Sequence, residues 1–174
     1  MVKVVGKKVY VLGTFRSAGP TSVSGAAEWT GAGWVPMGSG VPLWRQYQLA
    51  SAATDGHDLY VSTSGFGATE FLQRWDGTAW NPVGEAGPGG PAVAISGADI
   101  YAVGNFTQGY GVAKLEGSHW TGLGGAFRSA AGLPTFINAL AVNGADVYAA
   151  GFFATVEANA IEQVARWEIG RAHV

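Results

Sequence analysis

The chain has 174 residues, of which 28 are glycine, 7 are tryptophan and none is cysteine, and its formal net charge is −2. Hydrophobic residues make up 48% and charged residues 13%, a composition that excludes an intrinsically disordered chain. The lack of cysteine excludes disulfides and cysteine-ligated zinc. The small net charge argues against nucleic acid as a partner. No run of 18 apolar residues occurs, so we expect no membrane insertion.

Four segments of the chain repeat one order of aromatic residues. A tyrosine holds the same place in each, at Tyr10, Tyr60, Tyr101 and Tyr148. An apolar residue follows it at Trp29, Trp75, Leu115 and Trp167. A further tryptophan follows in the first three segments, at Trp34, Trp80 and Trp120. The tyrosines are spaced by roughly 40–50 residues, a period typical of β-propeller blades and of some helical repeats.

The local pattern decides between these two kinds of repeat. Apolar and small residues alternate over short stretches bounded by Gly, Asp or Asn, which is typical of strands rather than helices. The third segment predicts strands at 92–96, 100–105, 111–115 and 120–124. Pairs such as Asp76-Gly77 suit tight hairpins, because glycine readily adopts the positive φ that these turns need. Such turns are expected between the first and second strands and between the third and fourth.

The repeats therefore predict an all-β chain. The expected architecture is a β-propeller of about 3.75 four-stranded antiparallel blades, which makes an incomplete ring. A partial propeller is expected over 1–167, with blades at approximately 1–44, 45–90, 91–135 and 136–167.

The repeat also resembles a known family. The string Tyr-x-x-Gly-x-Phe, followed by Ala-x-Trp-x-Gly-x-x-Trp-x-x-(Met/Val/Leu)-Gly, resembles the kelch and galactose-oxidase-like repeats of large bacterial secreted or surface proteins. The resemblance covers most of residues 1–167 and implies an extracellular or cell-surface location. It also implies further blades in a longer chain. The second repeat departs from the pattern. Thr63 stands where the others have Gly13, Gly104 and Gly151, and Gly65-Phe66 is shifted by one residue, so we expect a bulge or a slipped loop at the end of its second strand.

The last seven residues, 168–174, resemble the translation of a sequencing-library adapter rather than a continuation of the repeat. We predict that they are not native, and that the fourth blade lacks its outer strand. An incomplete ring leaves apolar blade faces uncovered, so the isolated chain is expected to be oligomeric or poorly soluble.

The strand order places all the long loops on one face of the propeller, where binding residues usually lie. Their aromatic and cationic side chains are the predicted binding residues: Trp44, Arg45, Tyr47, Tyr110, Phe127, Arg128 and Phe136. Such side chains stack on sugars or anchor a protein partner; the alternative is that they fill the gaps between blades. The recurrent Asp58, Asp99 and Asp146 are expected to cap hairpin turns rather than to bind calcium. The sequence predicts no catalytic residue, no metal ligand and no cofactor.

The sequence thus favours a non-catalytic scaffold or binding segment of a larger bacterial surface or secreted protein, with a glycan or a protein as its ligand. Two alternatives stay open. In the first, the chain is part of a glycan-active propeller enzyme whose catalytic residues lie partly in missing blades. In the second, it is a purely structural spacer.

Overall fold

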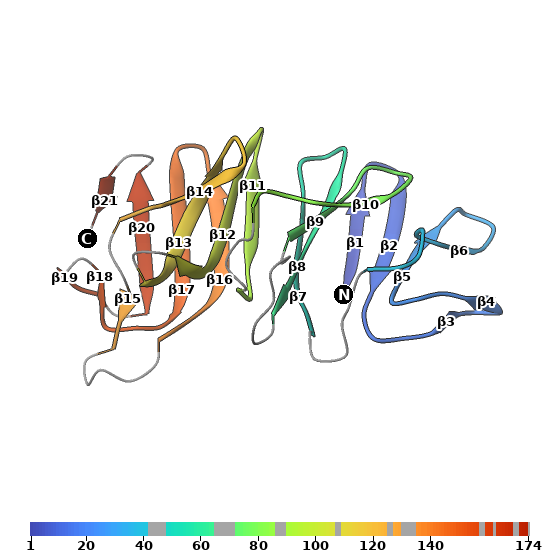
Figure 1. Cartoon of the computed structure of the whole chain (residues 1–174), viewed down its shortest axis with the longest axis horizontal. Helices are drawn as coiled ribbons and strands as arrows, with labels where there is room; N and C mark the ends of the chain where they lie inside the picture. Colours follow the sequence, from blue (N-terminus) through green and yellow to red (C-terminus); the bar gives the residue numbers. More distant parts are fainter. Residues whose placement is uncertain are drawn as a thin grey trace.

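The computed structural model describes residues 1–41, 48–64, 72–85, 90–106, 109–124, 127–129, 135–156, 159–161, 163–168 and 171–173. Every regular element within these ranges is a β-strand (Figure 1). The strands form four antiparallel sheets of four strands each and two smaller sheets. The prediction of an all-β chain built from four-stranded antiparallel repeats is confirmed.

The four large sheets, numbered here in chain order, are meanders in which each strand pairs with the next one of its sheet. Sheet 1 contains β1 (Val2–Val5), β2 (Lys8–Leu12), β5 (Ala26–Trp29) and β6 (Trp34–Pro36). Sheet 2 contains β7 (Gln48–Thr54), β8 (Leu59–Ser64), β9 (Leu72–Trp75) and β10 (Trp80–Pro82). Sheet 3 contains β11 (Val93–Ser96), β12 (Asp99–Phe106), β13 (Gly109–Glu116) and β14 (His119–Gly122). Sheet 4 contains β16 (Phe136–Asn143), β17 (Asp146–Phe152), β20 (Val164–Glu168) and β21 (Arg171–His173).

The connections differ between the two ends of the sheets. Short turns join the first strand to the second and the third to the fourth, and we call this the tight-turn end. The other connections leave the opposite end, which we call the long-loop end. They are longer, except in sheet 3, where β12 ends at Phe106 and β13 begins at Gly109. Three of them carry the smaller sheets. In one, β3 (Ser17–Ala18) pairs with β4 (Thr21–Ser22). Across the other two, β15 (Phe127–Arg128) pairs with β18 (Thr155–Val156), which pairs with β19 (Asn159–Ala160).

The hairpins β3–β4 and β18–β19 are equivalent insertions between the second and third strands of sheets 1 and 4. The N–H of Gly13 donates to the carbonyl of Gly25 at 2.9 Å, and the N–H of Gly151 donates to that of Gln163 at 2.9 Å. Gly25 and Gln163 also share a positive φ, at 70° and 66°. Sheets 1 and 4 therefore match in this detail as well as in strand order.

Each large sheet has two distinct faces. One carries the repeated tyrosine and is called the tyrosine face; the other carries Trp29, Trp75, Leu115 or Trp167 and is called the tryptophan face. The tyrosine face of each sheet packs on the tryptophan face of the next. Tyr10 and Leu12 of sheet 1 thus share a buried cluster with Leu59, Val61 and Trp75 of sheet 2.

The same contact recurs along the chain. Tyr60 and Leu72 of sheet 2 pack with Ile100 of sheet 3. Tyr101 of sheet 3 packs with Val147 and Trp167 of sheet 4. The hydrophobic core is thus a series of layers between neighbouring sheets. Sheets 1 and 4 lie at opposite ends of the molecule (Figure 1).

The structure differs from the sequence-based expectation at the outer edge of sheet 4. We expected no fourth strand there, but β21 pairs with β20, with Glu168 opposite Arg171 and Trp167 opposite Ala172. Strand pairing uses backbone N–H and C=O groups. A short segment of almost any sequence that follows a strand can therefore complete the ladder. Whether residues 168–174 are native stays a prediction.

The irregularity in sheet 2 also lies elsewhere than expected. The register shifts between Leu49 and Ser51 of β7, where β7 pairs with the end of β8. The same shift occurs between Ile137 and Ala139 in sheet 4. In sheet 4 the shifted strand faces Gly151, so the replacement of glycine by Thr63 is not its cause. Residues 65 and 66, where we expected the slip, lie outside the described residues.

Candidate functional site

The predicted binding residues come mostly from the long-loop end, and the structure describes only some of them. Trp44, Arg45 and Tyr47 lie outside the described residues. Tyr110 lies on β13 with its backbone paired to Asn105 of β12, and its side chain is outside the described part. The remaining three are Phe127, Arg128 and Phe136.

The side chain of Phe127 lies in the core. It is 3% exposed, its ring meets that of Phe153 edge-on at 4.7 Å, and it lies 5.2 Å from the ring of Trp167. It therefore fills the junction between sheets 3 and 4, which agrees with the gap-filling alternative for this residue. A ligand cannot reach a ring that is covered in this way.

Arg128 and Phe136 are both exposed, but they belong to different surfaces. Arg128 follows Phe127 on β15 and pairs with Thr155. Phe136 is 55% exposed and pairs with Phe152, on the tyrosine face of sheet 4. Phe127 contacts the opposite face of that sheet. The structure therefore does not gather these three predicted residues into one site.

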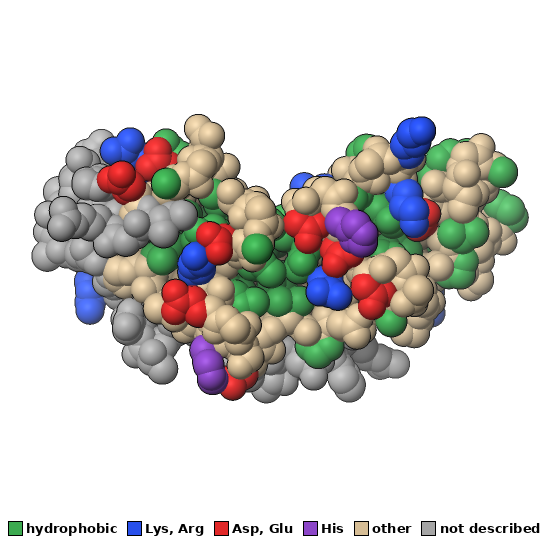
Figure 2. All heavy atoms as spheres, turned by 90° about the horizontal axis from the view of Figure 1, so that it is seen from above, with side chains coloured by type: hydrophobic (Ala, Val, Ile, Leu, Met, Phe, Trp, Pro, Cys, Tyr) green, Lys and Arg blue, Asp and Glu red, His purple; other side chains and the backbone are tan. Residues whose placement is uncertain are grey.

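The tight-turn end carries a row of ion pairs that the sequence analysis missed. The aspartate two residues before the repeated tyrosine pairs with a cation on the third strand of the same sheet. The distances are 3.2 Å from Asp58 to Arg74, 2.9 Å from Asp99 to Lys114, and 3.8 Å from Asp146 to Arg166. Figure 2, which shows this end from above, has acidic and basic side chains side by side across the molecule.

Sheet 1 holds the same pair with its charges reversed. Lys8 occupies the aspartate position and Glu28 the cation position, with Nζ and Oε1 3.2 Å apart. An alignment of the charged residues around the tyrosines contains this signal, because the two positions change sign together. The expectation that these aspartates cap hairpin turns is wrong for all three. The carboxylates of Asp99 and Asp146 accept from Tyr101 and Tyr148, and that of Asp58 contacts His57 and Arg74.

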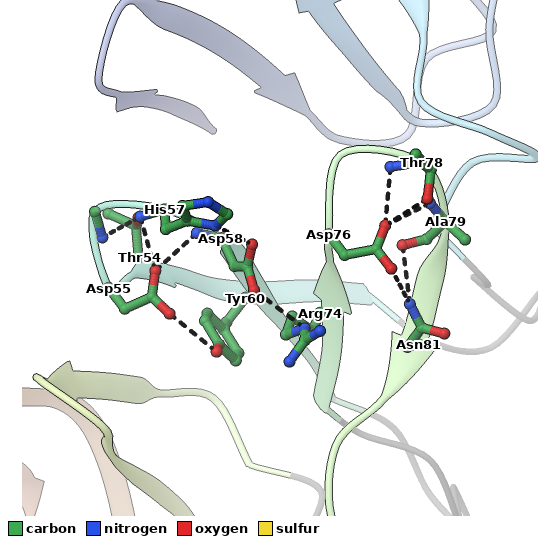
Figure 3. Close-up of polar contacts among 11 residues, drawn as sticks. Thr54, Asp55, His57, Asp58, Tyr60, Arg74, Asp76, Thr78, Ala79 and Asn81 are labelled. Atoms are coloured by element: carbon green, nitrogen blue, oxygen red, sulfur yellow. Dashed lines mark hydrogen bonds and ion pairs between the residues drawn. The ribbon is translucent and has the colours of Figure 1, made fainter.

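The richest polar cluster is in sheet 2 (Figure 3). Asp55 Oδ1 accepts the N–H of His57 at 2.8 Å and that of Asp58 at 2.7 Å, and its Oδ2 accepts the hydroxyl of Tyr60 at 3.1 Å. Asp55 is thus the residue that caps this turn. The imidazole of His57 lies 2.8 Å from Asp58, whose other oxygen meets Arg74.

The electrostatics of this cluster follow from its hydrogen bonds. Partial burial by itself raises the pKa of Asp55, but the hydrogen bonds from Asp58, His57 and Tyr60 outweigh burial and leave this pKa below its usual value. The hydrogen bond to Asp58, aided by its charge, raises the pKa of His57 above 6.5. Burial first, and then the charge of Asp55, raise the pKa of the Tyr60 hydroxyl.

The neighbouring turn is capped by Asp76. Its Oδ1 accepts the N–H groups of Ala79 and Thr78, each at 2.9 Å, and the hydroxyl of Thr78 at 2.8 Å. Its Oδ2 accepts the amide of Asn81 at 2.9 Å. These bonds to the ionised form hold the pKa of Asp76 far below its usual range. The ionised carboxylate thus stabilises the β9–β10 turn, in which Gly77 adopts a positive φ.

These contacts hold turns and strands together. The His57 side chain is 90% exposed and its nearest charged groups are already paired with one another. Among the described residues, no three His, Cys, Asp or Glu side chains lie close enough together to hold a metal ion. None of the described elements is a helix long and apolar enough to span a membrane.

Comparison with known proteins leaves the family open. No protein-family model matches the chain. No curated protein matches it significantly. The functional argument therefore rests on the sheets, their ends and their exposed faces.

The His57–Asp58 contact makes a measurable prediction. Asp58→Asn should lower the pKa of His57 toward 6.5, because the carboxylate is its largest stabilising partner. NMR titration of the imidazole reports this value directly. Because the folded-state pKa is raised, the contact stabilises the fold fully below pH 6.5 and loses its contribution as the pH rises through the raised pKa.

The matched control is Asp99→Asn, which removes the equivalent carboxylate from sheet 3 and should leave the titration of His57 unchanged. An unaltered pKa in Asp58→Asn would contradict the geometry of the cluster. The contribution to overall stability is expected to be small, because the histidine is exposed to solvent.

Proposed function

We propose that this chain is a non-catalytic scaffold of the β-propeller kind, a segment of a larger bacterial surface or secreted protein. One observation carries the proposal: four equivalent sheets are closed by short turns at one end and carry their longer connections at the other. A rigid stack with variable loops at one end is the usual architecture of a binding surface. The resemblance to kelch and galactose-oxidase-like repeats supports the same assignment.

The packing of the sheets supports a propeller-like arrangement. The innermost strands β1, β7, β11 and β16 lie next to one another in succession. Each sheet contacts its neighbours face to face through the tyrosine and tryptophan faces. In a propeller, blades pack radially in this way, with the first strands nearest the axis. Four sheets in an open row form part of such a ring.

The ligand that we propose for the long-loop end is a glycan or a protein. The candidate side chains there are aromatic or guanidinium groups, which bury large area or form several hydrogen bonds with little loss of conformational freedom. Trp44, Arg45, Tyr47, Tyr110 and Arg128 make up this set. Phe127 is left out because it is buried, and Phe136 because it faces the end of the stack.

The test compares variants at the two ends. The chain is screened on a glycan array and against candidate surface proteins, and Kd is measured for each hit. Trp44→Ala combined with Arg45→Ala should weaken binding at least about tenfold, the loss typical of one good contact. Lys7→Ala, in the exposed β1–β2 turn, is the matched control and should change nothing.

A ligand whose affinity depends on Lys7 and not on Trp44 would place binding at the wrong end and overturn the proposal. A chain that binds neither glycans nor proteins under these conditions would be a spacer, and the binding part of the proposal would be wrong.

A further inference from the structure

The tyrosine face of sheet 4 is uncovered. In sheet 3, Tyr101 is fully buried and Val112 is 2% exposed, because sheet 4 covers both. At the equivalent positions of sheet 4, Tyr148 is only half-buried and Val164 is 57% exposed. Phe152, on the same face, is 58% exposed. The last sheet thus presents the apolar surface that is buried in every earlier sheet.

The tryptophan face of sheet 1 is uncovered in the same way. Trp75 of sheet 2 and Trp167 of sheet 4 are 5% and 2% exposed, whereas the equivalent Trp29 of sheet 1 is 37% exposed. Val2 and Val4 of β1, on the same face, are 64% and 60% exposed. Two apolar faces of opposite kind therefore stand at the two ends of the stack.

We propose that the tyrosine face of sheet 4 in one copy of this chain packs on the tryptophan face of sheet 1 in a second copy. All three junctions between consecutive large sheets inside the chain join these two kinds of face, so the molecule contains the template for the contact. Exposed apolar faces of this kind favour association. The inference rests on the sheet packing alone and does not depend on the ligand proposed for the long-loop end.

The β3–β4 hairpin does not block this contact. It lies beside Ala27 and Trp34 and covers part of the tryptophan face of sheet 1. The equivalent β18–β19 hairpin of sheet 4 lies within a junction that the structure shows fully formed, where Val156 is 1% exposed in the same cluster as Tyr101. A tyrosine face can therefore pack on sheet 1 beside its hairpin, as the tyrosine face of sheet 3 packs on sheet 4.

The contact joins different surfaces on the two copies, which makes it heterologous. Such a contact closes into a ring when the rotation between copies allows it and otherwise continues as an open chain. Two copies supply eight sheets, which lies within the usual range for a closed propeller. In either case each contact buries the tyrosine face of sheet 4 of one copy and the tryptophan face of sheet 1 of another.

The test uses two single variants of the full chain. Val4→Lys places a charge on the tryptophan face of sheet 1, and Val164→Lys places one on the tyrosine face of sheet 4. Both side chains are exposed, so the isolated fold tolerates them. The weight-average mass is measured by sedimentation velocity and by light scattering over a range of protein concentrations.

The unmodified chain should at least double its mass as concentration rises. Each variant alone should stay monomeric, because it lacks one of the two faces. An equimolar mixture of the two variants should form a dimer through the intact tyrosine face of one and the intact tryptophan face of the other. Recovery of the dimer also shows that both variants are folded.

Val35→Lys is the matched control, since Val35 is an exposed valine at 41% on neither end face, and it should associate like the unmodified chain. Three results would overturn the proposal: an unmodified chain that stays monomeric, a single variant that still associates like it, or a mixture that stays monomeric. The second result would show pairing of like faces.

Discussion

Trp75→Ala should lower the free energy of unfolding by about 3–5 kcal/mol, the usual cost of removing a large aromatic side chain from a core. Trp75 is 5% exposed and lies in the cluster that joins sheets 1 and 2. Its ring contacts that of Trp80 at 5.3 Å, and its edge lies 3.3 Å from the place that a Cβ on Gly38 would take. Alanine leaves a cavity between the two sheets, beside the hydrogen bond that Trp80 Nε1 donates to the carbonyl of Met37 at 3.1 Å. Urea unfolding followed by tryptophan fluorescence and circular dichroism measures the change.

Trp29→Ala is the matched control, because Trp29 holds the same place in sheet 1 and has the same kind of partner in Trp34, at 5.2 Å. It has no preceding sheet over it and is 37% exposed. In dilute solution its replacement should cost only about 1 kcal/mol, the central value for a point substitution. Equal losses for Trp29 and Trp75 would show that packing between sheets contributes little to the stability of the chain.

Gly84→Ala should lower the free energy of unfolding by combining a backbone cost with a steric cost between sheets 2 and 3. Gly84 follows the outer strand of sheet 2 with a φ of +76°, and a Cβ on it would lie 2.9 Å from both Leu115 Cδ1 and Trp120 Nε1 of sheet 3. An L-residue in this backbone conformation costs about 1–2 kcal/mol. The added methyl group also pushes sheet 3 away, which costs about 1–3 kcal/mol more.

Gly117→Ala separates these two effects. Gly117 has a φ of +64°, but a Cβ there has nothing within 4 Å. It should show the backbone cost alone, so the difference between the two variants in urea unfolding measures the close approach of sheet 3 to Gly84. If both variants lose the same stability, the tight contact between Gly84 and Trp120 is not part of the fold in solution.

The strands and tight turns were predictable because their causes are local. Alternation of apolar residues around each tyrosine sets which side chains share a face, and Gly or Asp between two such stretches allows the chain to reverse. In sheet 3 the observed strands at Asp99–Phe106 and Gly109–Glu116 differ from the predicted ones only at their ends. The four-stranded repeat follows from the period of Tyr10, Tyr60 and Tyr101.

The candidate site was less predictable because its causes are not local. Phe127 is an aromatic residue in a long connection, which is typical of a binding loop. Its ring partners Phe153 and Trp167 come later in the chain, and only the fold brings them into contact with it. The ion pairs were missed for the opposite reason. The signs at Lys8 and Glu28 reverse those at Asp58 and Arg74, so each position taken alone looks variable. The feature is visible only when the two positions are compared together, and the register of the second and third strands pairs them.

The period of the aromatic residues, the apolar alternation around each tyrosine and the glycines between these stretches were enough to define an all-β chain of repeated four-stranded units. Those residues specify turns and sheet faces through short-range sterics and hydrophobic alternation. Only the tertiary structure decided which faces are covered, because burial depends on what lies opposite. Trp29 and Trp167 are the same residue in the same repeat position, yet one is exposed and the other buried, since a preceding sheet covers only the second.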